Sequence, residues 1–155
     1  MTLIKRNRIF AALTLVLLFS CLLALPVSAL EADPEMPEEP VEPDEPYVDI
    51  AGFYISCNVN TGGKAACYSY VTTDHSDYTI YLSLGIQRYD YYSDGTGYWH
   101  TIKSWSTSGT YRASLDKAWY VVPNHYYRST ATATVYTSSG SFVELVTVHS
   151  PSSYY

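Results

Sequence analysis

The chain has 155 residues, of which 9 are Lys or Arg and 15 are Asp or Glu, so its formal net charge is -6. That length suits one domain. A hydrophobic fraction of 47% with only 15% charged residues excludes a wholly disordered chain. The shortage of basic residues argues against a protein that binds nucleic acid by neutralising phosphates, so we expect no nucleic-acid partner.

The first 29 residues have the pattern of a secretory signal peptide. Three basic residues within positions 5–8 precede an apolar run of 17 residues at 9–25. Val27 and Ala29 supply the small side chains that signal peptidase binds, which predicts cleavage after Ala29. We therefore expect a secreted, extracellular protein that meets a membrane only through its transient signal peptide. An uncleaved anchor and a lipoprotein attached through Cys21 are the alternatives.

Residues 30–46 form the next segment, an acidic linker rich in proline. It contains eight of the fifteen acidic residues and almost no side chain that could enter a core, so it cannot fold alone. Its prolines recur at every third position from Pro34 to Pro46, which matches the three residues per turn of polyproline II. We interpret the linker as a stiff, solvated spacer. An ordinary disordered tail or a removable pro-segment is the alternative.

Residues 47–155 form the predicted folded domain. Seven acidic and six basic residues belong to it, so its net charge is -1 and it offers no strong long-range field. Its length is sufficient to bury one modest core.

Alternation of apolar and polar residues assigns this domain to the all-β class. At 78–86, Tyr, Ile, Leu, Leu and Ile occupy every second position, with Thr, Tyr, Ser and Gly between them. Turn signals rich in Gly, Asn, Asp and Pro separate this run from its neighbours, and no ten-residue stretch shows a helical stripe. The expected strands are near 53–59, 65–72, 78–89, 98–106, 111–121, 126–136 and 141–149. The expected turns are Thr61-Gly62-Gly63, Asp94-Gly95, Ser108-Gly109, Pro123-Asn124 and Ser138-Ser139-Gly140.

Seven short strands in about 100 residues predict a seven-stranded antiparallel two-sheet sandwich. The segment Pro123-Asn124-His125-Tyr126-Tyr127-Arg128 resembles the corner tyrosine that opens the sixth strand of fibronectin type III and immunoglobulin-like domains. The domain departs from true immunoglobulin domains, because the sixth strand has no cysteine and the third has no tryptophan. It is also similar to small secreted proteins of Gram-positive bacteria whose function is uncharacterised. The resemblance therefore implies a fold and no activity.

Two cysteines, Cys57 and Cys67, remain after removal of the signal peptide. Because the chain is expected to be exported, we expect them to form one disulfide. In a hairpin centred on Gly62 these residues lie opposite each other on one face, which requires a loop with an odd number of residues. A reactive thiol pair or half a metal site would need a CxxC spacing or nearby histidines, and the sequence has neither.

No constellation of residues specifies a reaction. The histidines at 75, 100, 125 and 149 never share a short ligand spacing, so we expect no metal and no cofactor. The segment from Asp74 to Asp77 is the only compact cluster of catalytic residue types, and a solvated turn explains it better than a serine nucleophile does. The acidic residues lie mostly in turns or at strand ends, which does not define a glycosidase pair. We expect a protein that is not an enzyme.

Glu144 is the only glutamate of the domain and shares its parity with Phe142, Val146 and Val148. If it faces the core, a partner must offset the cost of burying its charge. The neighbouring parity is equally apolar, so both orientations are open. The expected partners are three lysines, Lys64, Lys103 and Lys117, and an isopeptide cross-link like those of some Gram-positive sandwiches is a further alternative.

Tyrosine is strongly enriched, and all 17 tyrosines lie within residues 47–155. Many must be exposed, because a buried phenol needs a hydrogen-bond partner and alternate residues of a strand point outward. The densest run, at 89–100, mixes Tyr and Trp with Ser, Gly and Asp, which is the composition of antibody contact loops. We interpret it as a surface that binds an extracellular protein or glycan. The candidate binding residues are Tyr89, Tyr91, Tyr92, Tyr98, Trp99, His125 and Tyr126.

The expected topology gathers these residues at one end of the sandwich. The first-second, third-fourth and fifth-sixth connections share that end, which would place Tyr91 and Tyr92 near Gly62, His125 and Tyr126. The predicted function is extracellular binding without catalysis. One alternative is a structural or envelope-associated protein whose tyrosine pairs only cover a polar sheet, and a less favoured one is an exported hydrolase.

Overall fold

The computed structural model describes residues 47–155, so the predicted signal peptide (1–29) and linker (30–46) lie outside the described residues. The all-β prediction is confirmed, and residues 47–155 contain no helix with the length and hydrophobicity needed to span a bilayer. The strands are β1 (Ile50–Val59), β2 (Lys64–Thr73), β3 (Thr79–Tyr91), β4 (Gly97–Thr110), β5 (Arg112–Tyr120), β6 (Tyr126–Tyr136), β7 (Phe142–His149) and β8 (Ser153–Tyr154).

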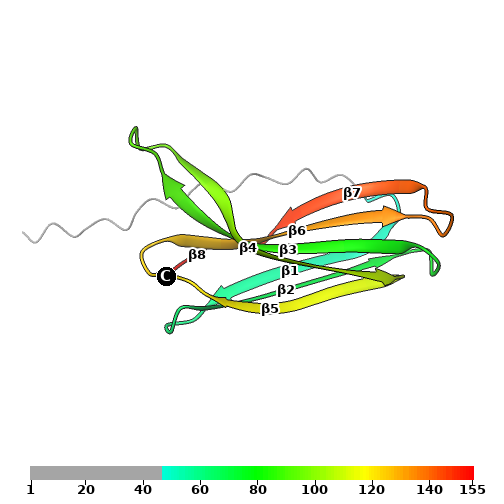
Figure 1. The fold of residues 1–155 in the computed structure, drawn as a ribbon, viewed down its shortest axis with the longest axis horizontal. Helices are drawn as coiled ribbons and strands as arrows, with labels where there is room; N and C mark the ends of the chain where they lie inside the picture. The colour runs from blue at the N-terminus through cyan, green and yellow to red at the C-terminus, as the bar shows by residue number, and fades with distance from the viewer. Residues whose placement is uncertain (1–46) are drawn as a thin grey trace, which may run out of the picture. The chain divides into compact units, whose positions relative to one another are not determined.

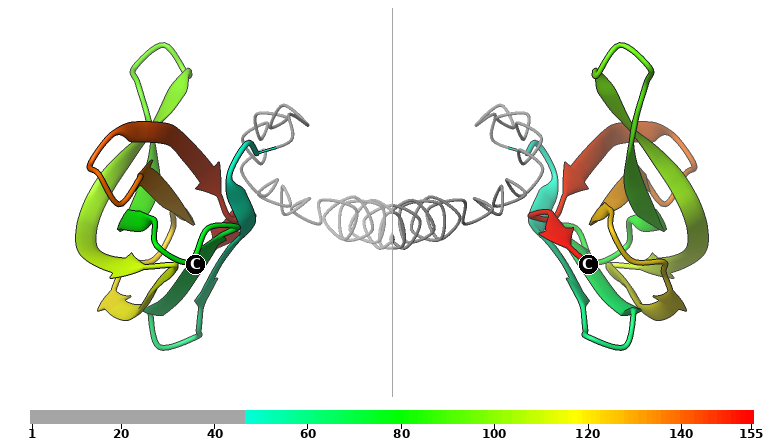
Figure 2. Two further views of the ribbon diagram at one scale, coloured as in Figure 1. Left: turned by 90° about the vertical axis from the view of Figure 1, so that its right-hand side faces the viewer. Right: turned by 90° about the vertical axis from the view of Figure 1, so that its left-hand side faces the viewer.

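The strands form two antiparallel sheets that pack face to face, as predicted (Figures 1 and 2). The first sheet has the order β1-β2-β5. The second has the order β4-β3-β6-β7, and the short β8 also pairs with β6. The hairpins β1–β2, β3–β4 and β6–β7 are joined within the sheets by the pairings β2–β5 and β3–β6, and the chain crosses between the layers after β2, β4 and β5.

The core lies between the sheets and follows the period-two alternation of the strands. Ile80, Leu82 and Leu84 of β3 are each at most 1% exposed. Their partners on β6 are small, since Leu82 lies opposite Ala133 and Leu84 lies opposite Ala131. Pairing a large side chain with a small one lets the layer interdigitate with the first sheet without voids.

The seven predicted strands are all present, and β4 is longer than expected. The turn predicted at Ser108-Gly109 is wrong, because β4 continues to Thr110 and the chain reverses at Tyr111, which has a φ of 68°. Gly109 serves a close backbone approach instead, since a Cβ there would collide with the carbonyl oxygen of Arg112. The eighth strand was not predicted, because two residues carry no periodicity.

Three hairpins, β1–β2, β3–β4 and β6–β7, share one turn geometry. In each, a four-residue turn ends at a glycine in the left-handed region: Gly63, Gly95 or Gly140, with φ of 75°, 86° and 85°. This is the three-residue loop whose glycine forms a bulge, and glycine is favoured because other residues have a steric cost there. The predicted odd-length loop around Gly62 is therefore confirmed.

The predicted disulfide is also confirmed. Cys57 of β1 lies directly opposite Cys67 of β2, and the two residues are bonded through their sulfur atoms. Cys67 is buried and belongs to the core between the sheets. The bond thus ties the first hairpin together where that hairpin faces the second sheet.

Glu144 takes the first of the two expected orientations, since Val146 and Val148 of the same parity pack toward the core while Leu145 is 58% exposed. Its carboxylate accepts hydrogen bonds from the backbone amides of Asp49, at 3.0 Å, and Val48, at 3.3 Å. A register shift in β7 beside Val135 accompanies this placement at the sheet edge, next to the start of β1. The predicted lysine partner is therefore wrong, because two backbone amides satisfy the carboxylate.

Candidate functional site

The β3–β4 hairpin extends beyond the sandwich as a two-stranded arm, defined here as residues 89–99. The pairing of β3 with β6 ends at Arg88, which lies opposite Tyr127, whereas β3 and β4 remain paired up to Tyr91 and Gly97. Figure 1 shows this arm projecting from the end of the molecule where β6 begins. Five of the seven candidate binding residues lie on it, and its rings reach solvent because no second sheet covers them.

Hydrogen bonds fix the tip of the arm. Tyr92 donates its backbone amide to the carbonyl of Thr96 at 2.6 Å, and Gly95 donates to the carbonyl of Tyr92 at 3.1 Å. The Asp94 carboxylate accepts from the amide and the hydroxyl of Thr96, at 2.9 and 2.6 Å, and these bonds lower the pKa of Asp94. The tip is therefore ordered before any ligand arrives, which reduces the entropic cost of binding.

One face of the arm carries the outer cluster, defined as Tyr89, Tyr91 and Trp99. The ring of Tyr89 contacts both others edge-on, with centroid distances of 5.2 Å to Tyr91 and 5.1 Å to Trp99. The guanidinium of Arg128 lies over Trp99 at 4.4 Å and donates through Nε to the side chain of Gln87 at 2.9 Å. This cation–π contact joins the base of the arm to β6.

Tyr91 extends the outer cluster toward the body of the sandwich. It is 52% exposed, and partial burial raises its pKa, with further contributions from the phenols of Tyr89, Tyr126 and Tyr154. Tyr126 itself packs against Tyr154 at 5.0 Å between centroids. The electrostatic influence of Tyr126 and Tyr154 on Tyr91 agrees with the predicted proximity of Tyr91 to Tyr126.

The opposite face carries the inner cluster, centred on Asp90. The Arg88 guanidinium forms an ion pair with this carboxylate. Its Nη2 donates a hydrogen bond to Asp90 Oδ2 at 2.9 Å, whereas its Nε lies 2.8 Å from Oδ1 but is not aligned for a hydrogen bond. His100 Nδ1 lies 2.9 Å from Asp90, and His125 Nε2 lies 3.7 Å from it. Partial burial opposes ionisation of Asp90, but Arg88, His100 and His125 outweigh it and hold its pKa below the usual value.

Stacked tyrosines continue the inner face to the tip. Tyr92 stacks on Tyr98 with 4.5 Å between centroids, and Tyr98 lies 5.8 Å from His100. Tyr92 and Tyr98 are 55% and 40% exposed. This stack is the part of the inner face that a partner could contact.

The pleat of the strands therefore divides the candidate residues between two faces. Tyr89, Tyr91, Trp99 and Tyr126 lie on the outer side, whereas Tyr92, Tyr98 and His125 lie on the inner side. His125 lies beside the arm, as predicted, and its contact there is with Asp90, which was not among the predicted residues. The β1–β2 turn lies at the same end of the sandwich as the arm, as predicted, but the two diverge toward opposite sides of it, so the expected proximity to Gly62 is wrong (Figures 1 and 2).

Sequence reasoning missed four charged or titratable contributors to this site: Arg88, Asp90, His100 and Arg128. Alternation along residues 87–91 could have predicted that Arg88 and Asp90 lie on the face opposite to Tyr89 and Tyr91. The contacts of Asp90 with His125 and of Arg128 with Trp99 join strands that are distant in the sequence, so no local pattern shows them.

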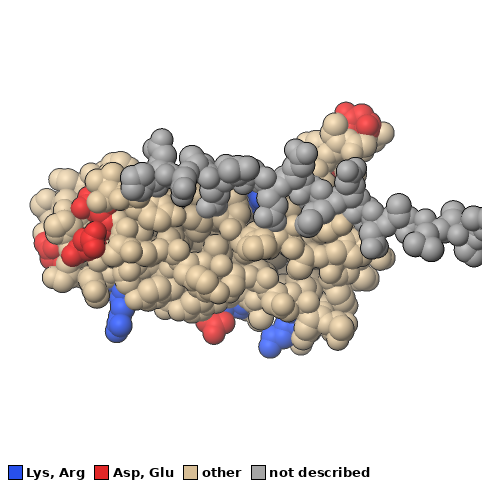
Figure 3. Space-filling model, turned by 180° about the vertical axis from the view of Figure 1, so that it is seen from behind, with Lys and Arg blue, Asp and Glu red and all other residues tan. Residues whose placement is uncertain are grey.

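Most tyrosines are exposed, as predicted. Ten of the seventeen are exposed and two, Tyr126 and Tyr127, are buried. Charged side chains are sparse on the face seen in Figure 3, where acidic side chains mark the tip of the arm. The surface of residues 47–155 thus offers aromatic and hydroxyl groups more than charge.

The other chemical candidates do not assemble within the described region. Residues 74–77 are all exposed, in agreement with a solvated turn. Among residues 47–155, no three His, Cys, Asp or Glu side chains are arranged to hold a metal ion.

Comparisons with known proteins assign no family. No protein-family model and no curated protein matches the chain. Among solved structures, a match is found to the sporulation control protein Spo0M from Bacillus subtilis, with a TM-score of 0.36 and 10% sequence identity. It covers 66% of this chain and 48% of that one, so this chain spans about half the length of its structural match. Neither a fold family nor a function follows from a likeness at this level.

Proposed function

We propose that this protein is a secreted, non-enzymatic β-sandwich that binds an extracellular protein or glycan through the aromatic arm. The observation that carries this proposal is the projection of residues 89–99 beyond the end of the β3–β6 pairing, with exposed rings on both faces. Tyrosines that only cover a sheet have no need of such an arm.

The order within the arm supports a recognition role. Tyr91, Tyr92 and Tyr98 are each at least 40% exposed, yet each ring contacts another ring. Rigid aromatic groups provide contact area while losing little conformational entropy, which is why binding loops favour them. The disulfide between Cys57 and Cys67 supports export, because such bonds persist in oxidising compartments.

We also propose that the sandwich resembles fibronectin type III domains in its strand arrangement. In immunoglobulin constant domains the fourth strand belongs to the first sheet, whereas here β4 pairs with β3 in the second. Tyr127 opens β6, is 1% exposed, and donates its hydroxyl to the carbonyl of Val122 at 2.7 Å. This bond has the form of the tyrosine corner of these sandwiches.

The test replaces exposed rings of the arm together. The triple variant Tyr91→Ala, Tyr92→Ala, Tyr98→Ala should keep a melting temperature close to that of the parent, because these rings lie outside the core. It should lose retention on at least one immobilised secreted protein or envelope glycan that the parent protein binds. Tyr120→Ala is the matched control, since Tyr120 is 72% exposed on the first sheet.

The competing proposal is a structural or envelope-associated protein without a specific ligand. Cross-strand ring pairs favour it, such as Tyr54 with Tyr68 at 6.0 Å and Tyr81 with Tyr136 at 5.7 Å. If the triple variant loses stability and retention together, or if Tyr120→Ala loses retention as well, packing is the better account.

A further inference from the structure

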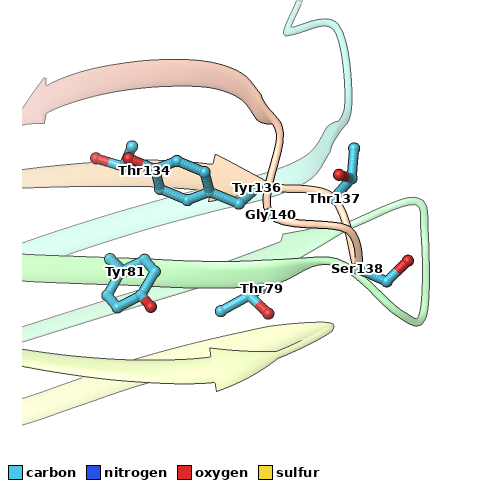
Figure 4. A pocket seen from close by; sticks show the side chains of 7 residues that line it. All are labelled: Thr79, Tyr81, Thr134, Tyr136, Thr137, Ser138 and Gly140. Carbon is cyan, nitrogen blue, oxygen red and sulfur yellow. The ribbon is translucent and has the colours of Figure 1, made fainter.

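A groove on the outer face of the second sheet lies apart from the arm. It spans β3 and β6 beside the β6–β7 turn and has a volume of about 470 Å³. A hollow of about 350 Å³ adjoins it across β3, β4 and β6, and Tyr81 and Thr134 line both. Figure 4 shows side chains of the two strands and the turn facing one opening. Volumes of this size accommodate small ligands or segments of longer ones.

The lining of the groove is uncharged and rich in hydroxyl groups. The outward positions of the two central strands are Thr79, Tyr81 and Ser83 on β3 and Thr132, Thr134 and Tyr136 on β6. Ser106 and Ser108 of β4 continue the series. Every one of these side chains can both donate and accept a hydrogen bond. The hydroxyls of a sugar need partners of that kind.

Aromatic rings provide an apolar wall beside these hydroxyls. Tyr81 is 55% exposed and meets Tyr136 edge-on, with 5.7 Å between centroids. Phe142 is 60% exposed and also meets Tyr136 edge-on, with 6.0 Å between centroids. Mutual contact holds the three rings in place, so a ligand that stacks on them orders little further.

We propose that this groove binds a neutral oligosaccharide chain. An exposed ring next to hydroxyl groups matches the two surfaces of a sugar, its C–H face and its hydroxyl edge. The lining offers no cation for a uronate, sulfate or phosphate group, which favours uncharged residues. A chain is favoured over a monosaccharide because the second hollow continues the groove across the sheet. The site goes beyond the arm and does not depend on it.

The test is calorimetric titration of the purified protein with neutral hexasaccharides, cellohexaose, xylohexaose and mannohexaose, and with an acidic hexagalacturonate. At least one neutral hexasaccharide should bind saturably, and its affinity should be unchanged between about 50 and about 500 mM salt. Tyr81→Ala should weaken that binding by about tenfold or more, as loss of an aromatic anchor does. Thr134→Val, which keeps the shape of the side chain, should weaken it less and leave the fold intact.

Two controls locate the site. Tyr54→Ala removes an exposed ring of the first sheet that, like Tyr81, contacts another tyrosine ring. Tyr91→Ala removes an exposed ring of the arm. Neither variant should change the affinity for the oligosaccharide. Absence of saturable binding by all three neutral hexasaccharides, or tighter binding of the acidic one, overturns the proposal. So does an equal loss with Tyr54→Ala. Loss with Tyr91→Ala but not with Tyr81→Ala also overturns it, and leaves the proposed role of the arm standing.

Discussion

Two polar side chains organise the end of the sandwich from which the arm projects. Tyr127 is buried at the start of β6 and donates its hydroxyl to Val122. Asp90 contacts Arg88 and His100 at the base of the arm and His125 in the β5–β6 connection. Each acts through a hydrogen bond or a charge, so each can be tested by removing a single atom or charge.

Replacing Tyr127 with phenylalanine should destabilise the domain without changing its shape. The ring still fills its place in the core, but the Val122 carbonyl loses its donor. A bond of this kind contributes about 0.5–1.5 kcal/mol, and an unpaired partner adds to the loss. Urea unfolding followed by fluorescence measures the difference. Tyr136→Phe, which changes a partly exposed ring on the same strand, is the control and should have little effect.

Asp90→Asn should lower stability at neutral pH, and the deficit should disappear in acid. The pKa of Asp90 is held below its unfolded value of 3.8, so its stabilising effect is fully present above about pH 4. That effect is lost as the pH falls through the lower folded pKa. Melting temperatures of parent and variant between about pH 7 and about pH 2 test this. A deficit that is constant across the range would contradict it, and Asp116→Asn on β5 is a suitable control.

At the scale of elements, the three glycine-ended hairpins determine where the strands turn. They differ in how closely other groups approach the glycine. A Cβ on Gly63 would lie 2.8 Å from the carbonyl oxygen of Val121, whereas a Cβ on Gly140 would meet nothing within 4 Å. Gly63 and Gly140 therefore share a backbone conformation, but only at Gly63 is there no room for a Cβ atom.

Gly63→Ala should cost more stability than Gly140→Ala. Both place a side chain in the left-handed region, at roughly 1–2 kcal/mol. Only the first also forces a backbone oxygen of the β5–β6 connection to move. Paired urea unfolding curves measure both free energies of unfolding. Equal losses would show that the contact with Val121 relaxes without cost.

How much of each element could be predicted depends on whether its cause is local. The alternation at 79–86 and the turn at Thr61-Gly62-Gly63 are local, so β3, the first hairpin and its disulfide followed from the sequence. The reversal at Tyr111 depends instead on backbone bonds to Tyr78 and Thr73 across the sheets. Gly109 therefore looked like a turn residue in the sequence, whereas in the structure it allows the backbone of Arg112 to pass close to β4.

The candidate site divides in the same way. Clustering of rings at 89–100 predicted a tyrosine-rich loop between the third and fourth strands, and exposure of Tyr91, Tyr92 and Tyr98 followed from the surplus of tyrosine. The separation into two faces depends on the register of β3 with β4, and the contact of His125 with Asp90 depends on how β5 returns to β6. Neither is encoded within a few residues.

At the scale of the whole molecule, residues 47–155 present rings and hydroxyl groups with a net charge of -1. Binding through the arm should therefore depend little on ionic strength, because long-range attraction contributes almost nothing. Retention on the same immobilised partner at about 50 and about 500 mM salt tests this. Strong loss of retention at high salt would show that the few charged side chains contribute most of the binding free energy instead.

The most direct test of the account is a tyrosine iodination footprint, mapped by peptide mass spectrometry, of the free protein and of the protein retained on immobilised envelope glycans or secreted proteins. In the free protein, Tyr91, Tyr92 and Tyr98 should be labelled and Tyr127 should not. On retention, the three arm tyrosines should become protected while Tyr120 stays labelled. Unchanged labelling of the arm, or equal protection of Tyr120, would contradict the assignment of the arm as the binding surface.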